Sequence, residues 1–180
     1  MTLRSLVHRR PEIADPWAQF PQLWDTLFDD VDFGNLEQPG LDGIIFTKRE
    51  PDPRRFGVVE TDAGGRATRL IEKPDSLENN NILIGLYYFA DGAWLARACG
   101  ELLESHQQTK GEYYLADAVT RMIQQGANFC VREVGVWQDT GKPETTFLTH
   151  RYLLEHGYDN SFEALRPGVA LIPPVYVHPK

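Results

Sequence analysis

The sequence predicts an α/β fold in which helices flank a central sheet. Ile82–Phe89 is rich in β-branched and aromatic residues, as strands are. Farther along, Leu115, Val119, Met122 and Ile123 recur at helical spacing, which indicates an amphipathic helix. The chain has 180 residues, 42% of them apolar, which suits the core of one domain with at most a small appendage.

Composition narrows the classes of function. The net charge of −8 argues against a nucleic-acid partner, which normally meets a basic surface, but Mg²⁺ can reconcile acidic residues with phosphate substrates. No apolar run approaches the roughly 18 residues of a membrane span, and the basic N-terminus lacks the apolar core of a signal peptide. Cys99 and Cys130 fit no metal or redox spacing, so we expect free thiols and a soluble protein of the cytoplasm.

The predicted elements begin after an irregular lead-in. Residues 1–24 contain Pro11, Pro16 and Pro21, and no helical or alternating period lasts through them. Residues 42–47 then form a short, largely apolar run. We expect this run to be a strand that is buried on both faces.

A hairpin follows, with arms at 56–61 and 66–73 and turn-forming residues between them. In its second arm, alternation places Leu70 and Glu72 on one face and Lys73 on the other. We therefore expect Glu72 and Lys73 to lie at a strand end with their side chains pointing in opposite directions.

One more strand and three helices extend the pattern. Within the strand at 82–89, Gly85 marks either a bulge or the close approach of a ligand, and the sequence leaves both open. The first helix follows Asp91, a good N-cap, and the second ends near Gly126. The third helix is expected over 143–156.

The stretch at 133–144 joins a strand to this third helix. We expect one strand over 129–136, a turn at Gly141, and Pro143 in the first helical turn. Asp139 then lies just beyond the carboxyl end of a strand, where open α/β sheets hold ligands, and its carboxylate suits a hard cation such as Mg²⁺. The alternative is that Asp139 only accepts hydrogen bonds in the turn or caps the helix.

Four features carry candidate chemistry: Asp25, the pair Glu72 and Lys73, Gly85 with its strand, and Asp139. Two carboxylates could clamp Mg²⁺ against phosphate oxygens, a lysine could hold a second phosphate, and a glutamate could accept hydrogen bonds from sugar hydroxyls. The alternatives are a strand-end charge pair for Glu72 and Lys73 and a solvated acidic turn for Asp25. The sequence contains no P-loop, no nucleophile elbow and no His-Glu-x-x-His motif.

Six short motifs together resemble the sugar-1-phosphate nucleotidylyltransferases. Each motif is weak by itself, and their occurrence in the family's order makes the resemblance specific. The glucose-1-phosphate thymidylyl- and uridylyltransferase branch looks closest. In chain order the motifs are Asp25–Phe28, Arg55–Glu60, Ile71–Pro74, Ile84–Phe89, Gly111–Asp117 and Val136–Gly141. The resemblance implies a partial Rossmann-like nucleotidyltransferase sheet with flanking helices. It also implies a reaction in which the phosphate of a sugar 1-phosphate attacks the α-phosphate of a nucleoside triphosphate, and pyrophosphate leaves.

The resemblance assigns roles by position. Asp25 and Asp139 occupy the places of the family's two metal-binding aspartates, which implies Mg²⁺ as the cofactor. The positions at which the family contacts the sugar and its phosphate are Gly57, Glu72, Lys73, Gly85 and Tyr87. Trp137 would help to wall that pocket.

The resemblance covers only part of the family's catalytic domain. Residues 25–158 match its acceptor half, whereas nothing in 1–24 resembles the Gly-rich loop that cradles the triphosphate. Residues 165–180 look like the opening of a left-handed β-helix. We therefore expect an N-terminally incomplete member of the family, and the activity of this chain by itself is doubtful.

Two further expectations follow from the missing half. The sheet edge that the absent strands would cover favours self-association. A non-catalytic module that binds a sugar phosphate or a partner subunit is the alternative function. A third hypothesis is an unrelated metal-dependent phosphohydrolase that uses Asp25 and Asp139.

Overall fold

The computed structural model describes residues 26–29 and 36–178, and the chain folds into two compact units. The sheet unit comprises residues 31–135. The ribbon unit combines residues 1–30 with residues 136–180. The boundaries that the sequence suggests after residues 24 and 158 stay predictions.

The sheet unit is built on a mixed five-stranded sheet in the order β4-β3-β5-β2-β6. Its strands are β2 (Gly43–Arg49), β3 (Gly57–Thr61), β4 (Ala67–Glu72), β5 (Asn81–Phe89) and β6 (Phe129–Glu133). β2 and β6 run parallel, whereas the other neighbouring pairs are antiparallel. The predicted first strand, the hairpin and the strand at 82–89 are confirmed as β2, β3 with β4, and β5.

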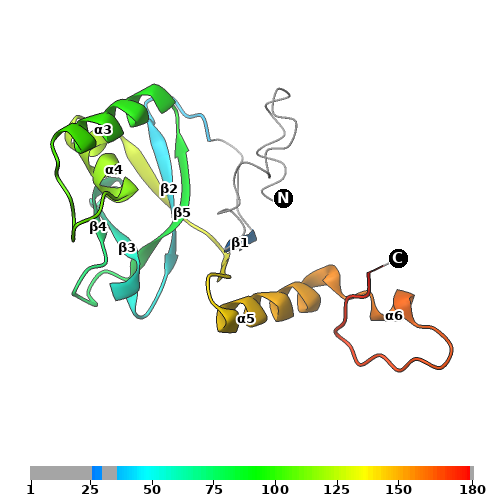
Figure 1. The fold of residues 1–180 in the computed structure, drawn as a ribbon. Coiled ribbons are helices and arrows are strands. Elements are labelled where there is room, and N and C mark those ends of the chain that lie inside the picture. Colours follow the sequence, from blue (N-terminus) through cyan, green and yellow to red (C-terminus); the bar gives the residue numbers. More distant parts are fainter. Residues whose placement is uncertain (1–25, 30–35, 179–180) are drawn as a thin grey trace. The chain divides into compact units, whose positions relative to one another are not determined.

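Two helices cover one face of this sheet. Helix α3 (Gly92–Glu104) and helix α4 (Leu115–Gln124) lie side by side against it (Figure 1). The buried core contains side chains of both layers: Ile45, Val59, Leu83, Phe129, Ala98, Leu102, Val119 and Met122. Every residue of β2 from Gly43 to Thr47 is buried, which confirms that this strand is covered on both faces.

The helices start and stop as the sequence predicts. The Asp91 carboxylate accepts a hydrogen bond from the Ala93 N–H at 2.8 Å and so caps α3. Helix α4 ends at Gln124, two residues before Gly126. No helix among residues 26–29 and 36–178 is both long and apolar enough to cross a membrane.

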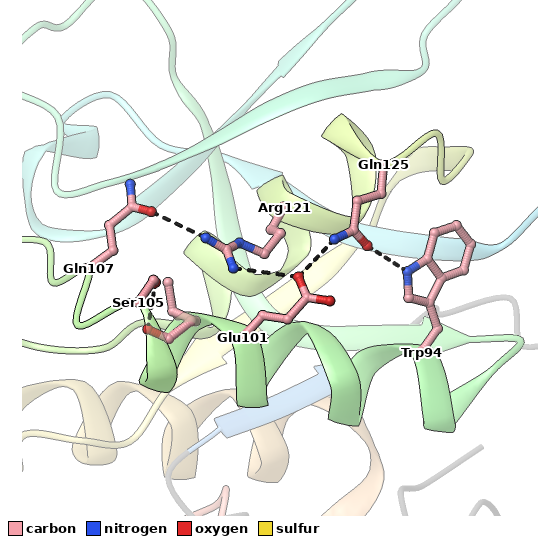
Figure 2. A network of polar contacts seen from close by, with 7 residues as sticks. Trp94, Glu101, Ser105, Gln107, Arg121 and Gln125 are labelled. Carbon is pink, nitrogen blue, oxygen red and sulfur yellow. Dashed lines mark hydrogen bonds and ion pairs between the residues drawn. The ribbon is translucent and has the colours of Figure 1, made fainter.

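A chain of polar side chains ties α3 to α4 (Figure 2). The Glu101 carboxylate accepts hydrogen bonds from Gln125 Nε2 at 2.8 Å and from Arg121 Nη1 at 3.4 Å. Trp94 Nε1 donates to Gln125 Oε1 at 3.0 Å, and Arg121 Nη2 donates to Gln107 Oε1 at 3.4 Å. The apolar core holds the two helices together, and this partly exposed network helps to set their relative orientation.

Helix α4 also protects the edge strand β4. The Leu70 N–H donates to Thr120 Oγ1 at 3.0 Å, and the same hydroxyl donates to the Leu70 carbonyl at 3.2 Å. Leu70 is buried, so its main-chain groups would otherwise lie at a sheet edge with little access to water. One threonine hydroxyl therefore satisfies both groups.

The single strand predicted over 129–136 was wrong. β6 ends at Glu133, and β7 (Val136–Asp139) belongs to a separate two-stranded sheet in the ribbon unit. There it pairs antiparallel with β1 (Thr26–Asp29). The local valine-rich pattern could not reveal this break, because it depends on a partner strand about 110 residues away in the chain.

The ribbon unit continues with short helices and an irregular tail. Helix α5 (Pro143–Leu153) begins at the predicted proline, and a wider turn over Leu154–Tyr158 extends it. Helix α6 follows at Ser161–Ala164. Between 165 and 178 the tail has no strand, so the predicted start of a β-helix is not confirmed. The Asn160 side chain instead hydrogen-bonds both the N–H and the carbonyl of Val177.

We expect Thr120→Val to lower the free energy of unfolding by about 1–3 kcal/mol, because the N–H and the carbonyl of Leu70 lose their partner. Urea denaturation followed by circular dichroism measures the change. Thr68→Val is the matched control, since it makes the same substitution at an exposed position of β4. Equal losses in the two variants would contradict the capping role.

Candidate functional site

The Glu72 carboxylate lies at the end of β4, directly opposite Gly57 on β3. A Cβ atom on Gly57 would stand 2.8 Å from Glu72 Oε2 and 2.7 Å from Leu83 Cδ1. Both distances are shorter than real Cβ contacts, so a side chain at position 57 would force the ends of Glu72 and Leu83 to move, whereas glycine lets the carboxylate lie against β3. The predicted site residues Gly57 and Glu72 are thus in contact.

Burial raises the pKa of Glu72 above its usual value. The positive charges of Lys73 and Lys110 oppose this rise in pKa, while the carboxylates of Asp117 and Glu112 add to it. The carboxylate therefore sits in a cluster of both signs rather than in a simple pair. Such a group, half-buried among charges, is typical of functional sites, although structural ion networks also produce it.

Lys73 departs from strand geometry. Its φ of 47° is left-handed, which is uncommon for a residue other than glycine, so the alternation that predicted its direction of reach ends at Glu72. Its Nζ donates to Tyr114 Oη at 3.4 Å, and this hydrogen bond raises the pKa of Lys73. Tyr114 Oη in turn donates to Glu112 Oε2 at 2.6 Å.

Lys110 brings a second ammonium group to the same place. Its Nζ donates to the Lys73 carbonyl at 2.8 Å, across 37 residues of sequence. Lys110 also has a left-handed φ, of 52°, within a tight turn in which Thr109 and Glu112 exchange backbone hydrogen bonds. Two lysines in this uncommon conformation, each costing of order 1 kcal/mol, indicate a backbone that the surrounding structure holds in place.

Tyr87 completes the arrangement from β5. Burial raises the pKa of its hydroxyl far above the usual value, and the nearby Glu72 charge raises it further. Its ring stacks on Phe89 with the centroids 6.0 Å apart. We call Glu72, Lys73, Tyr87, Lys110 and Tyr114 the Glu72 cluster.

Gly85 lies in a bulge of β5. Ile45 pairs with Tyr87 and Thr47 pairs with Leu83, so three residues of β5 oppose one residue of β2. Gly85 has a φ of 76°, and the space beside it is open. The bulge interpretation is confirmed, and the close approach of a ligand at Gly85 stays a prediction.

Asp139 is the last residue of β7 in the ribbon unit. Its Oδ1 accepts a hydrogen bond from the Gly141 N–H at 2.8 Å, as the turn interpretation predicts. Its carbonyl accepts one from the buried Thr149 hydroxyl at 3.2 Å. Trp137 is half-buried on the same strand. The place of Asp139 and Trp137 beside the Glu72 cluster is a prediction from the resemblance.

Asp25, the other predicted metal ligand, lies outside the described residues. Its neighbour in the chain, Thr26, pairs with Asp139. Within 26–29 and 36–178, no group of three or more His, Cys, Asp or Glu side chains could hold a metal ion. The donor chemistry of Asp139 fits Mg²⁺, which proteins bind through one or two carboxylates while waters and substrate phosphates fill the remaining positions.

Sequence reasoning missed Lys110 and Tyr114 as members of the Glu72 cluster. The family-like motif Gly111–Asp117 flanks or contains them, and that was the available signal. Asp117 was missed as well. Its Oδ2 is buried and has no hydrogen-bond partner in the described part of the chain.

Residues 32–156 match the family described as nucleotidyl transferase. The chain belongs to this family. It is 33% identical over 129 residues to the low-salt glycan biosynthesis nucleotidyltransferase Agl11 of Haloferax volcanii. It is 31% identical over 150 residues to a glucose-1-phosphate thymidylyltransferase of Streptomyces antibioticus. These matches confirm the predicted membership of the sugar-1-phosphate nucleotidylyltransferases.

The nucleotidyl transferase fold is confirmed by a solved structure. A nucleoside-diphosphate-sugar pyrophosphorylase of Vibrio cholerae superposes with a TM-score of 0.61 at 21% identity, over 71% of this chain and 53% of that one. The matches to Agl11 and to the thymidylyltransferase cover 71% and 72% of this chain, but only 32% and 40% of those relatives. This member of the family therefore spans well under half the length of these two relatives.

We expect Glu72→Gln to raise the melting temperature at pH 7 and to leave it nearly unchanged near pH 4. The folded-state pKa of Glu72 lies above its unfolded value of 4.5, so the ionised carboxylate destabilises the folded chain. The free energy of unfolding therefore falls as pH rises from 4.5 through the folded-state pKa, and glutamine, which cannot ionise, avoids this loss. Thermal unfolding at both pH values measures this difference. Glu60→Gln, at an exposed position of β3, is the control and should show no such pH dependence. A lower melting temperature for Glu72→Gln at pH 7 would contradict a destabilising charge.

Proposed function

We propose that this chain supplies the sugar 1-phosphate site of a nucleotidyl transfer reaction. The observation that carries the proposal is the Glu72 cluster, in which one half-buried carboxylate lies among two ammonium groups and two tyrosines. A sugar 1-phosphate needs cations for its phosphate and a fixed acceptor for its hydroxyls. The Glu72 cluster offers both kinds of group.

Each member of the Glu72 cluster has a proposed task. The ammonium groups of Lys73 and Lys110 hold the phosphate as point charges. The Glu72 carboxylate accepts hydrogen bonds from sugar hydroxyls, and burial makes those bonds stronger than they would be in water. Tyr87 donates a hydrogen bond from its phenol, because its raised pKa keeps it protonated. The open bulge at Gly85 leaves room for the sugar ring.

In the proposed reaction, an oxygen of the sugar phosphate bonds to the α-phosphorus of a nucleoside triphosphate. The bond from that phosphorus to the bridging oxygen breaks, and pyrophosphate leaves with the electron pair. Asp139 and Asp25 would hold Mg²⁺, which supplies the neutralisation of phosphate charge. Thr26, the residue after Asp25 in the chain, pairs with Asp139, and this pairing supports the assignment.

The names of the relatives support the substrate class. The match from Streptomyces antibioticus is a glucose-1-phosphate thymidylyltransferase, and one from Desulfitobacterium hafniense is a glucose-1-phosphate adenylyltransferase with 35% identity over 119 residues. Both names give glucose 1-phosphate as the acceptor, but they differ in the nucleotide that is transferred. We therefore propose a sugar 1-phosphate as the ligand of the Glu72 cluster and leave the nucleotide open. We propose the cytoplasm as the location, because both cysteines are free thiols.

Thermal unfolding in Mg²⁺ tests the proposed ligand. We expect glucose 1-phosphate to raise the melting temperature more than inorganic phosphate does, because only the folded chain presents Glu72 to the sugar hydroxyls. At a ligand concentration of 100 times Kd, the added stability is about 2.7 kcal/mol. Lys73→Met should lose most of the shift. Arg97→Met, which removes an exposed cation on α3, is the control and should keep it.

The same scans contain the contradicting outcomes. If glucose 1-phosphate produces no shift, or if Lys73→Met retains the full shift, the Glu72 cluster is not the acceptor site. A parallel scan with a nucleoside triphosphate shows whether this chain also binds the donor. Release of pyrophosphate from the two substrates together would establish the transfer.

We also propose that the chain self-associates through the outer edge of β6. β6 is the last strand of the sheet order, and among the described residues no named strand pairs with its outer edge, which forms an isolated bridge from Cys130 to Arg66. The Val134 N–H points to β2, where it donates to the Thr47 carbonyl, so alternation directs the N–H of Glu133 outward. An edge strand with an outward N–H at Glu133 favours pairing with a second copy.

Sedimentation velocity over a range of concentrations tests this association. We expect a dimer whose fraction falls in Glu133→Pro, because proline removes the outward N–H without touching the pairing with β2. Glu133→Ala is the matched control, since it removes the same side chain and keeps the N–H. A dimer fraction that is equal in the two variants would contradict pairing through this edge.

A further inference from the structure

The ladder between β3 and β5 is unusually short. These two strands share one register pair, Val58 with Ile82, whereas β3 pairs with β4 along its whole length from Gly57 to Thr61. The second half of β3 therefore has a strand on one edge and none on the other. The main-chain groups on that second edge need partners of another kind.

The side chain of Asn79 takes the place of a strand beside Val59. Its Nδ2 donates to the Val59 carbonyl at 2.8 Å, and its Oδ1 accepts a hydrogen bond from the Asn81 N–H at 3.1 Å. Alternate residues of a strand direct their main-chain groups to the same edge, so those of Thr61 point to this edge as well. Within the described residues, no strand pairs with Thr61 there.

A groove of about 450 Å³ lies at this end of the sheet unit. Of the described residues that line it, Val59 is the one apolar residue. The polar lining includes Asn79 and side chains from three strands and a loop: Arg49, Glu60, Thr61, Glu78 and Asn81. We call this groove the Asn79 groove.

The Asn79 groove continues the face of the sheet that carries the core. Alternation places Thr61 on the same face as Val59, and Asn81 on the same face as Leu83. Val59 and Leu83 are buried in the core, whereas Thr61 is exposed and Asn81 is half-buried. The residues thus change from apolar to polar two positions along each strand, where the core ends and the groove begins.

Hydrogen bonds hold the segment 79–81 against its neighbours. Arg49 Nη1 donates to Asn80 Oδ1 at 2.9 Å, and the Glu50 N–H donates to the Asn80 carbonyl at 3.0 Å. These contacts tie the segment to β2, while the bond from Asn79 to Val59 ties it to β3. Polar groups that are already held in place lose little conformational entropy when a ligand binds, which favours binding.

The lining groups favour a neutral ligand with many hydroxyls. They include one guanidinium, that of Arg49, and two carboxylates, those of Glu60 and Glu78, so an anion gains little net attraction. A mostly polar lining also suits an apolar molecule poorly, because its polar groups would lose water without gaining a partner. Amides and hydroxyls both donate and accept hydrogen bonds, as sugar hydroxyls do.

We propose that the Asn79 groove binds a neutral mono- or disaccharide at a site separate from the Glu72 cluster. Gly57 lies opposite Glu72, and Thr61 lies four residues farther along β3, which corresponds to about 13 Å of extended strand. The volume of the groove falls within the range of about 300–1,000 Å³ that small-molecule sites occupy. This inference does not depend on the proposed function.

Titration of the full chain with maltose, a neutral disaccharide, tests the site by amide NMR. We expect saturable chemical-shift changes at Thr61, Asn79 and Asn81, and none at Lys73 or Tyr87. The Kd should be on the order of 1 mM or weaker, because no aromatic ring is among the described lining residues to stack on the sugar. Inorganic phosphate should leave the amides of the groove unchanged.

Two variants test the lining groups separately. Arg49→Met removes the guanidinium, and Thr61→Val replaces a hydroxyl with a methyl group of similar size. We expect each to raise the Kd for maltose at least threefold, while the core amides of Ile44 and Val119 keep their shifts. Arg97→Met, which removes an exposed cation from α3, is the control and should retain the wild-type Kd.

Three results would overturn the sugar site. The first is a uniform, unsaturable shift of exposed amides on α3 and on the hairpin alike, which reflects the general effect of sugars on protein hydration. The second is a saturable response to maltose centred on Lys73 and Tyr87, which places the sugar in the Glu72 cluster. The third is a wild-type Kd in both Arg49→Met and Thr61→Val.

Glucose 1-phosphate separates this inference from the proposed function. If it shifts Lys73 and Tyr87 while maltose shifts nothing, the Asn79 groove is not a sugar site and the proposed function stands. If maltose shifts Thr61 and Asn79 as expected while glucose 1-phosphate leaves Lys73 and Tyr87 unchanged, the Asn79 groove is supported and the proposed function is contradicted.

Discussion

β2 is the strand on which the remaining structure of the sheet unit depends, because β5 and β6 pair with its two edges. The buried run from Gly43 to Thr47 contains one polar side chain, that of Thr47, so almost no side chain competes with the backbone hydrogen bonds to the neighbouring strands. On one edge, the register with β5 contains the bulge that carries Gly85 and brings Tyr87 into the Glu72 cluster. On the other edge, the parallel ladder with β6 ends at Thr47 and Glu133, and Lys48 Nζ donates a hydrogen bond to the Gly135 carbonyl just beyond it.

The Glu72 cluster combines several groups that each lower the stability of the folded chain. A half-buried carboxylate with a raised pKa and two lysines in left-handed conformations are each unfavourable alone. The hydrogen bond from Lys110 to the Lys73 carbonyl and the contact of Lys73 with Tyr114 offset part of that cost. Since a core alone does not need such groups, their concentration supports a binding function.

The proposed chemistry is divided between the two units of the chain. The sheet unit holds the Glu72 cluster, and the ribbon unit holds Asp139 with its turn at Gly141 and its contact with Thr149. Members of the nucleotidyl transferase family named for the same acceptor carry different nucleotides in their names. The proposed site for a sugar 1-phosphate corresponds to the acceptor that those two names share.

The sequence by itself determined the local elements and the family. Alternation, helical period and caps such as Asp91 report on neighbours within a few residues, and the order of six short motifs is enough to indicate a nucleotidyl transferase. Only the tertiary structure decided the contact of Gly57 with Glu72, the approach of Lys110 to Lys73 and the break between β6 and β7. Each of these depends on strand register or on a backbone conformation that distant residues impose, and no local pattern encodes such contacts.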